Sequence, residues 1–281
     1  MSQTTPPSPA AGEPKQPTHH VFERIYRHAI WGANSDGAGR SGSGSTLHST
    51  LIYRTFLQQF LKDFAIRSVV DAGCGDWEST QALDWSGIDY KGYDIVEAVI
   101  AQNRVRFAKP NVQFFVANFV DTELPPADLL ICKHVLQHLP TKDVQRFLSQ
   151  TTKHEHVLLT NGVDPKTLSA ENIDIAIGNY RRLDPTTAPF NIVAEKCLTY
   201  QDHVATHQVV HVRKSPNIPV EGTNRFTEYD VKLHLQSHGF SNIVELKLRE
   251  RGLWFGRAQR DQSAFDVLVD AQGKVFGRPA G

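Results

Sequence analysis

The chain has 281 residues, of which 40% are hydrophobic and 21% charged, as is typical of a globular protein with one large domain or two. Thirty Lys and Arg residues balance thirty Asp and Glu residues, which argues against binding of nucleic acid through a strongly basic surface. No apolar run approaches the roughly 18 residues of a membrane span, and the first residues lack the pattern of a secretory signal. Three cysteines without a CxxC pair indicate neither a disulfide framework nor a thiolate zinc site, so the reducing cytoplasm is the expected compartment.

Composition divides the chain into four segments. Residues 1–20 are rich in Pro, Ser and Thr, and we expect them to form a disordered tail. Residues 21–214 hold the main domain. Residues 215–223 have the composition of a linker, and residues 224–280 are long enough for a small α+β domain.

Short β-branched runs alternate with helical runs through the main domain. A first helix is predicted from Val21 and a second over residues 47–64, capped by Thr46, with a glycine- and serine-rich stretch at 32–46 between them. The predicted strands cover residues 68–72, 90–94, 112–116, 128–132, 156–160, 196–200 and 208–213, and further helices cover 95–108 and 142–150. We therefore expect an α/β fold, a Rossmann-like, mostly parallel seven-stranded sheet with flanking helices.

The C-terminal segment has a different pattern. Thr227 is expected to cap one helix that ends at Gly239. Three alternating strands follow, at residues 244–249, 253–259 and 264–270.

A glycine turn after the first strand is the strongest signal in the sequence. The stretch VVDAGCGD ends a strand at Asp71 and places Gly73 and Gly75 on either side of Cys74. Glycines at such a turn let the backbone bend tightly and approach a ligand closely. A tight turn without a ligand is the alternative.

Acidic residues beside this turn favour a cationic ligand. Glu78 stands where the dinucleotide-binding pattern G-x-G-x-x-G has its third glycine, and Asp76 and Glu78 would repel a pyrophosphate. S-adenosylmethionine carries an ammonium and a sulfonium and no phosphate, so Asp71 and Asp76 have the right charge for it. An NAD(P)-dependent oxidoreductase is the alternative that these residues disfavour.

Further candidates follow the second and third strands. Asp94 ends the second strand and is followed by Ile95, and an acid at this place can accept both hydroxyls of a ribose. A capping role is the alternative for Asp94. Asn118 and Phe119 follow the third strand, where an amide and a ring could meet an adenine. The alternatives are a strand-end turn and a core ring.

Lys133 and His134 follow the fourth strand and face the same crevice. His134 is a candidate base for an acceptor that must lose a proton, and Lys133 is a second catalytic candidate. A solvated or structural role is the alternative for each. His134 and His138 are spaced like two metal ligands on a helix, but no third ligand is recognisable, so no metal site is expected.

Together these residues resemble class I S-adenosylmethionine-dependent methyltransferases over about residues 21–214. A narrower likeness to an uncharacterised bacterial subfamily rests on the stretches SGSGST, DAGCGDW, DWSGIDYKGYD, ADLLICKHVLQHL and YRRLDPTTAPF. The resemblance implies that Gly73 and Gly75 lie behind the methionine moiety and that Asp71 lies under its ammonium. The expected cofactor-binding residues are Asp71, Gly73, Cys74, Gly75, Asp94, Ile95, Asn118, Phe119 and Lys133. The family usually has Asp at the position of Asn118.

Two loops complete the expected site. The resemblance makes residues 41–46 a lid or pocket edge rather than a mere linker. The long stretch 162–190 has little periodicity, and its Arg181 and Arg182 are candidates for an anionic substrate group, with a solvated pair as the alternative.

We therefore expect S-adenosylmethionine-dependent methyl transfer to oxygen or nitrogen of a small-molecule or glycan acceptor, by in-line displacement. A catalytically silent S-adenosylmethionine-binding scaffold is the main alternative. Neither a membrane nor a nucleic acid is expected as a partner. Residues 224–280 are similar to small PepSY-like domains, which implies an interaction module and a protein partner.

Overall fold

The computed structural model describes residues 17–32, 40–213 and 221–280. The chain divides between Lys214 and Ser215 into two compact units, here the first and the second unit. The expected tail lies outside the described residues as far as residue 16, and the expected linker as far as residue 220. No helix in the described ranges is long and apolar enough to cross a membrane.

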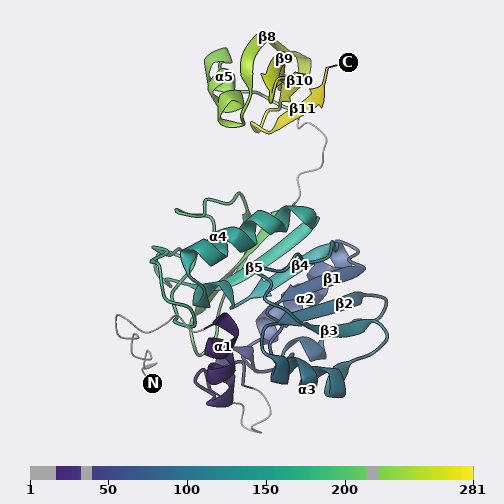
Figure 1. Cartoon of the computed structure of the whole chain (residues 1–281), viewed down its shortest axis with the longest axis vertical. Helices are drawn as coiled ribbons and strands as arrows, with labels where there is room; N and C mark the ends of the chain where they lie inside the picture. Colours follow the sequence, from purple (N-terminus) through teal and green to yellow (C-terminus); the bar gives the residue numbers. More distant parts are fainter. Residues whose placement is uncertain (1–16, 33–39, 214–220, 281) are drawn as a thin grey trace. The chain divides into compact units, whose positions relative to one another are not determined.

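The first unit is built on one seven-stranded sheet with the order β3-β2-β1-β4-β5-β7-β6 (Figure 1). Its strands are β1 (Ser68–Ala72), β2 (Asp89–Asp94), β3 (Val112–Val116), β4 (Leu129–Lys133), β5 (His156–Val163), β6 (Glu195–Gln201) and β7 (Thr206–Arg213). The first five strands pair in parallel, whereas β7 runs antiparallel to both β5 and β6. The predicted fold class is confirmed. The strand order reverses between β1 and β4, which is where sheets of this kind bind ligands.

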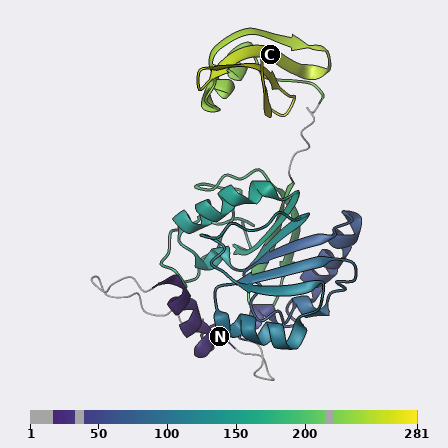
Figure 2. The same ribbon diagram turned by 45° about the vertical axis from the view of Figure 1, so that its right-hand side comes forward.

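Both faces of the sheet are covered, which explains why nearly all residues of its central strands β1, β4 and β5 are buried. Alternate residues of β1 enter different cores, with Val70 packed on one face and Val69 on the other. Helices α1 (Thr18–Arg27) and α4 (Thr141–Gln150) contribute to the first core, and α2 (Leu51–Asp63) to the second. Helix α3 (Glu97–Phe107) packs beside β3 at the sheet edge (Figure 2).

Two helix starts differ from the predictions. Helix α1 begins at Thr18, within the expected tail, because the helical bonds of buried Phe22 reach four residues back along the chain. Helix α2 begins at Leu51, since Thr46 caps an earlier turn by accepting a hydrogen bond from the Ser49 amide at 3.2 Å. The described residues also form short 3₁₀ helices at Ser43–Ser45, Thr80–Ala82, Leu136–His138, Thr151–Lys153 and Glu250–Gly252.

The long loop after β5 contains no helix or strand among its described residues and is held by buried polar groups. The Arg181 side chain is only 4% exposed. Its guanidinium donates hydrogen bonds to the Leu139 carbonyl at 2.8 Å, the Ile173 carbonyl at 2.7 Å and the Thr141 hydroxyl at 2.9 Å. The expectation that Arg181 meets a substrate anion is therefore wrong, because all these contacts lie inside the protein. Its neighbour Arg182 is half-exposed and pairs with Asp164.

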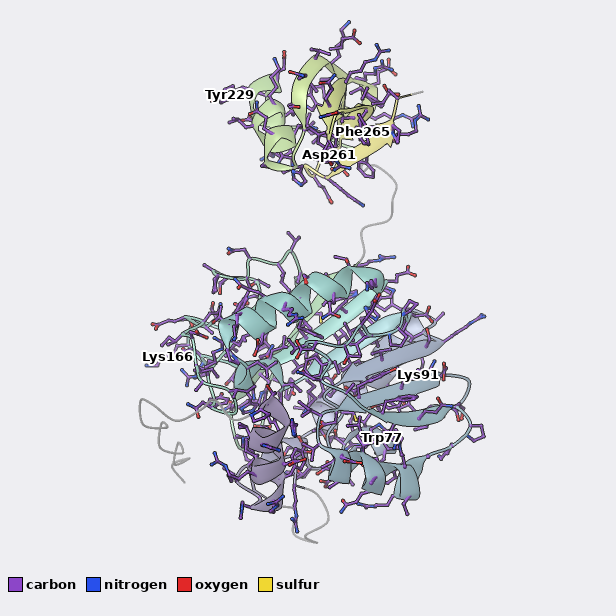
Figure 3. The ribbon with its side chains drawn as sticks, viewed as in Figure 1. Trp77, Lys91, Lys166, Tyr229, Asp261 and Phe265 are labelled. Carbon is purple, nitrogen blue, oxygen red and sulfur yellow. The ribbon has the colours of Figure 1, made fainter. Side chains whose placement is uncertain are left out.

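The second unit consists of α5 (Glu228–Ser237) and a four-stranded antiparallel sheet. Its strands are β8 (Ser241–Arg249), β9 (Leu253–Arg260), β10 (Ser263–Val269) and β11 (Val275–Pro279), in the order β11-β10-β9-β8. Thr227 caps α5 in a reciprocal arrangement with Asp230, and Gly239 ends it at a φ of +81°, as predicted. Strand β11 was not predicted, because a short edge strand that ends at a proline resembles a loop in sequence. Tyr229 projects from α5 and is exposed (Figure 3).

Replacing Arg181 tests whether the guanidinium holds the loop. We expect Arg181→Ala to lower the free energy of unfolding by about 2–4 kcal/mol, because it removes three buried hydrogen bonds and leaves two carbonyls without their donor. The matched control is Arg182→Ala next to it, for which we expect a change within about 0.5 kcal/mol. Urea denaturation measures both, and equal effects would contradict this account of the loop.

Candidate functional site

A cavity of about 840 Å³ lies at the carboxyl ends of β1, β2 and β4. Its walls come from α1, residues 41–45, the loop at 177–182 and the start of β7. Ligand sites commonly span roughly 300–1,000 Å³, so the cavity has room for a cofactor and a small acceptor together. The cavity is lined by every predicted cofactor residue except Gly75, namely Asp71, Gly73, Cys74, Asp94, Ile95, Asn118, Phe119 and Lys133.

Asp71 is the last residue but one of β1, and its carboxylate lies inside the protein. The residue is 5% exposed, and its carboxylate accepts a hydrogen bond from the Tyr90 hydroxyl at 2.6 Å. Burial raises the pKa of Asp71 from 3.8 to about 6, although Tyr90 and the ammonium of Lys133 lower it. The cavity wall thus carries a carboxylate that lacks a full set of partners.

Asp94 fastens the glycine turn to the end of β2. One of its oxygens accepts the Gly75 amide at 3.1 Å and the other accepts the Val96 amide at 3.0 Å. Burial raises the pKa of Asp94 to about 6 against these two hydrogen bonds. The carboxylate therefore holds the turn that leads into α3, whose N-cap is Val96, and it also lines the cavity. The predicted ribose contact is compatible with this role in the turn.

The two glycines are required by the packing of the chain on itself. Gly73 has a φ of +83°, and a Cβ there would collide with the side chain of Val135. Gly75 has a φ of +56°, and a Cβ there would lie 2.5 Å from the Ser41 hydroxyl. Close approach by a protein segment, rather than by a ligand, thus explains both glycines. Cys74 between them lines the cavity, and burial raises the pKa of its thiol.

Residues 40–45 cover the glycine turn through Asp76. The carboxylate of Asp76 accepts hydrogen bonds from the amides of Arg40 at 2.6 Å and Ser41 at 2.9 Å. In return, the Ser41 hydroxyl accepts the Asp76 amide at 3.0 Å and contacts the Tyr26 hydroxyl at 2.9 Å. The segment forms an edge of the cavity, with α1 behind it. Residues 33–39 of the same glycine-rich stretch lie outside the described residues.

Asn118 and Phe119 line the cavity but are engaged elsewhere. The Asn118 amide donates to Asp121 at 2.6 Å, and its oxygen accepts the Val120 amide at 3.2 Å. Phe119 is 6% exposed and packs edge-to-face on Phe147. These contacts are those of a strand-end turn and a core ring, so an adenine contact by this pair remains a prediction.

Lys133 and His134 lie together under the covering segment. The Lys133 ammonium donates to the Gly44 carbonyl at 3.3 Å and lies 3.1 Å from His134 Nδ1. Burial lowers the pKa of Lys133 to about 8. Burial and the charge of Lys133 hold the pKa of His134 well below its usual value. The backbone of His134 has a φ of +59°, a strained conformation of the kind that often occurs at functional sites.

His138 is held inside the protein. Its Nδ1 lies 3.0 Å from the Asn179 carbonyl oxygen, and burial lowers its pKa to about 4. Its ring packs on Trp31, with the ring centres 4.5 Å apart. These contacts account for His138 without a ligand.

His207 and Asp202 join the site without having been predicted. His207 lines the cavity, and its Nε2 lies 3.0 Å from the Asp202 carboxylate. The His207 ring packs on that of His134, with centres 4.3 Å apart. An acid and a histidine close to the turn of a predicted hairpin could have indicated this pair. The predicted strands 196–200 and 208–213 left both residues in the connection between them.

A comparison with protein families matches residues 69–155 to a methyltransferase domain. Over these residues the first unit is therefore similar to a methyltransferase domain. No curated protein matches the sequence.

Solved structures share the fold of the first unit. Magnesium protoporphyrin IX methyltransferase (ChlM) from Synechocystis PCC 6803, with bound S-adenosylhomocysteine, matches at 16% identity and a TM-score of 0.50, covering 71% of this chain and 100% of that one. The N-methyltransferase NodS from Bradyrhizobium japonicum WM9, with the same ligand, matches at 13% identity and a TM-score of 0.52, covering 70% and 97%. None of the comparisons bears on the PepSY-like resemblance of the second unit.

Asp71→Asn tests the cost of the buried carboxylate. A pKa raised from 3.8 to about 6 means that the folded protein binds this proton more tightly than the unfolded chain. The carboxylate therefore destabilises the fold fully above about pH 6, and this cost disappears as the pH falls toward 4. We expect Asp71→Asn to raise the free energy of unfolding at pH 7 by about 1–3 kcal/mol.

Urea denaturation at pH 7 and at about pH 4 measures this effect. The control is Asp89→Asn, at the start of β2, where the carboxylate is half-exposed and pairs with Lys91. Its expected change is within about 0.5 kcal/mol. A loss of stability on Asp71→Asn at pH 7 would show that the ionised carboxylate is adequately solvated in the folded protein.

Proposed function

We propose that the methyltransferase domain binds S-adenosylmethionine and transfers its methyl group to a small-molecule or glycan acceptor. The observation that carries the proposal is the pair of buried carboxylates, Asp71 and Asp94, at the ends of adjacent strands in one cavity. Solved methyltransferases of the same fold hold S-adenosylmethionine or S-adenosylhomocysteine, which supports this choice of cofactor.

The charges of the site fit this cofactor. In this proposal Asp71 pairs with the ammonium, and Asp94, which accepts two amides, uses its remaining lone pairs for the hydroxyls of the ribose. Asp76 and Asp94 beside the turn disfavour a phosphate, which argues against a dinucleotide. When bound, S-adenosylmethionine supplies an electrophilic methyl group on a sulfonium.

The chain's own residues orient the reactants and exclude water. Residues 41–45 and α1 close one side of the cavity over the glycine turn, and Lys133 links the covering segment to the end of β4. A nucleophile held in line with the methyl group saves several kcal/mol of the barrier, so enclosure and alignment are the main contribution of the fold.

We also propose a compartment and a class of partner. Three free cysteines support a reducing cytoplasm as the compartment, and balanced charge supports a small acceptor. A protein-binding role for the second unit is supported by exposed apolar side chains on α5, those of Tyr229 and Leu233.

Calorimetric titration tests the cofactor. We expect S-adenosylmethionine and S-adenosylhomocysteine to bind with micromolar affinity, about −8 kcal/mol, and NAD not to bind. Asp71→Asn should weaken the binding of S-adenosylmethionine at least tenfold, because it removes the negative charge opposite the ammonium. Asp89→Asn should leave the affinity unchanged. Binding of NAD alone would favour an oxidoreductase, and binding of none of the three would contradict the proposed function.

The affinity for S-adenosylmethionine should also depend on pH. Asp71 and Asp94 have raised pKa values of about 6 in the free protein, and a cation binds their ionised forms. The affinity is therefore expected to be constant above about pH 7 and to fall as the pH falls through 6, by about tenfold per required carboxylate at pH 5. Calorimetry across this range measures it. A flat profile in the wild type would show that neither carboxylate titrates against the ligand.

A further inference from the structure

We propose that His207 accepts the proton of a hydroxyl-bearing methyl acceptor and that Asp202 positions its imidazole ring. The inference rests on the proposed function and narrows the acceptor to a hydroxyl. It replaces His134 as the candidate base with His207, a residue of β7 that lines the same cavity.

The two nitrogens of His207 are in different surroundings. The residue is 3% exposed, and its Nε2 lies 3.0 Å from Asp202 Oδ2. The two atoms are close enough for an ion pair but are not aligned as a hydrogen bond, and neither has a hydrogen-bond partner among the described residues. His207 Nδ1 is also buried without a hydrogen-bond partner among those residues. A carboxylate beside Nε2 favours the tautomer with its proton there, which leaves the lone pair of Nδ1 free on a residue that lines the cavity.

Asp202 is fixed by its own hairpin. Its Oδ1 accepts the amides of Val204 at 2.7 Å and Ala205 at 2.9 Å, so Oδ2 is the oxygen left for His207. Burial acts to raise the pKa of Asp202, but His207 and these amides outweigh it and lower the pKa to about 2. The carboxylate therefore stays ionised through the physiological range.

The charges around the two histidines favour His207 over His134 as the base. His134 Nδ1 lies 3.1 Å from the Lys133 ammonium, so a proton gained by His134 would place two positive charges together. A proton gained by His207 would be paired with Asp202 instead. The other rings against His207 are those of His134 and Tyr200, with centres 4.3 and 5.0 Å away.

The covering segment excludes water from this pair. A Cβ on Gly44 would lie 3.9 Å from Asp202 Oδ2 and 3.7 Å from His134 Nδ1. The backbone at Gly44 therefore passes directly over the His134 ring and the Asp202 carboxylate. A dry environment strengthens the attraction between an imidazolium and its carboxylate.

The transfer step balances in charge and atoms. The acceptor oxygen attacks the methyl carbon, the C–O bond forms, and the C–S bond breaks with its electron pair staying on sulfur. The hydroxyl proton moves to His207 Nδ1. The positive charge that the sulfonium loses reappears as an imidazolium beside Asp202, so the buried site ends with the same net charge.

A base such as His207 accelerates methylation of a hydroxyl group, and it is most effective for a phenolic hydroxyl. A neutral amine is nucleophilic without losing a proton first, whereas a hydroxyl gains most of its reactivity as the proton leaves. The pKa of a phenol, about 10 as in tyrosine, is closer to that of an imidazole than the pKa of an aliphatic alcohol is. The arrangement of His207 and Asp202 thus favours phenolic acceptors over amines.

Nitrogen NMR tests the tautomer without any acceptor. The full chain with ¹⁵N-labelled histidine is bound to S-adenosylhomocysteine, and His207→Gln assigns the signal among 13 histidines. We expect His207 to carry its proton on Nε2 near neutral pH, and Asp202→Asn to weaken or reverse that preference. A proton on Nδ1, or a tautomer unaffected by Asp202→Asn, would overturn the proposal.

A matched pair of probes tests the acceptor class. The probes are 7-hydroxy-4-methylcoumarin and 7-amino-4-methylcoumarin, which differ only in the nucleophile, and formation of S-adenosylhomocysteine is measured. We expect methylation of the hydroxyl probe, a loss of about 10²–10⁴ in kcat in His207→Gln, and a smaller loss in Asp202→Asn. Both losses should shrink as the pH rises and the phenol ionises unaided. Preference for the amine, or losses that do not change with pH, would contradict the assignment.

Two controls separate this proposal from the proposed function. His203→Gln, in the same hairpin, replaces an exposed histidine whose ring contacts Ser49 and does not line the cavity, so its activity should equal that of the wild type. Calorimetry should show unchanged S-adenosylmethionine affinity in His207→Gln and Asp202→Asn. If the wild type does not bind the cofactor, the proposed function is wrong. If it binds the cofactor but the loss of kcat in His207→Gln does not change with pH, only the assignment of His207 as the base is wrong.

Discussion

The burial of two carboxylates at the ends of β1 and β2 is the constraint on which the first unit depends. Asp94 is tolerated because it accepts the amides of the glycine turn and of the chain leading into α3, which fixes both. Among the described residues, Asp71 accepts a hydrogen bond from the Tyr90 hydroxyl and is attracted by the Lys133 ammonium. Burial raises the pKa of both groups, so the two carboxylates carry an electrostatic cost that the proposed cationic ligand would reduce. In the proposed function, the feature that destabilises the fold also selects the ligand.

Much of this site follows from sequence because the ends of parallel strands converge. Once the β-branched runs are recognised, Asp71, Asp94 and Lys133 must meet at one edge of the sheet, and the structure places them there. The individual contacts of the glycines do not follow. Gly75 is required by Ser41, a residue of a segment whose path over the turn no local pattern reveals.

The residues missed or misread are those whose roles depend on contacts distant in sequence. Arg181 looked free in a polar loop, but its guanidinium is buried against Leu139, which follows β4. Asp202 and His207 meet because β6 and β7 form a hairpin in which Tyr200 pairs with His207 and Gln201 with Thr206, and strand prediction does not give register at that precision. Sequence patterns located the end of the sheet correctly, but they did not determine which side chains face each other there.

Lys133 connects the two halves of the site. Burial lowers its pKa, while Asp202, Asp71 and Asp76 raise it, and the balance leaves a pKa of about 8. The ammonium therefore partly neutralises Asp71 on the cofactor side and Asp202 on the acceptor side. A cation bound at Asp71 would reduce the attraction between that carboxylate and the Lys133 ammonium. The ammonium would then interact mainly with Asp202 and with His134 Nδ1. His134 would then be kept neutral when the cofactor is present, which leaves His207, paired with its own carboxylate, as the group able to take a proton.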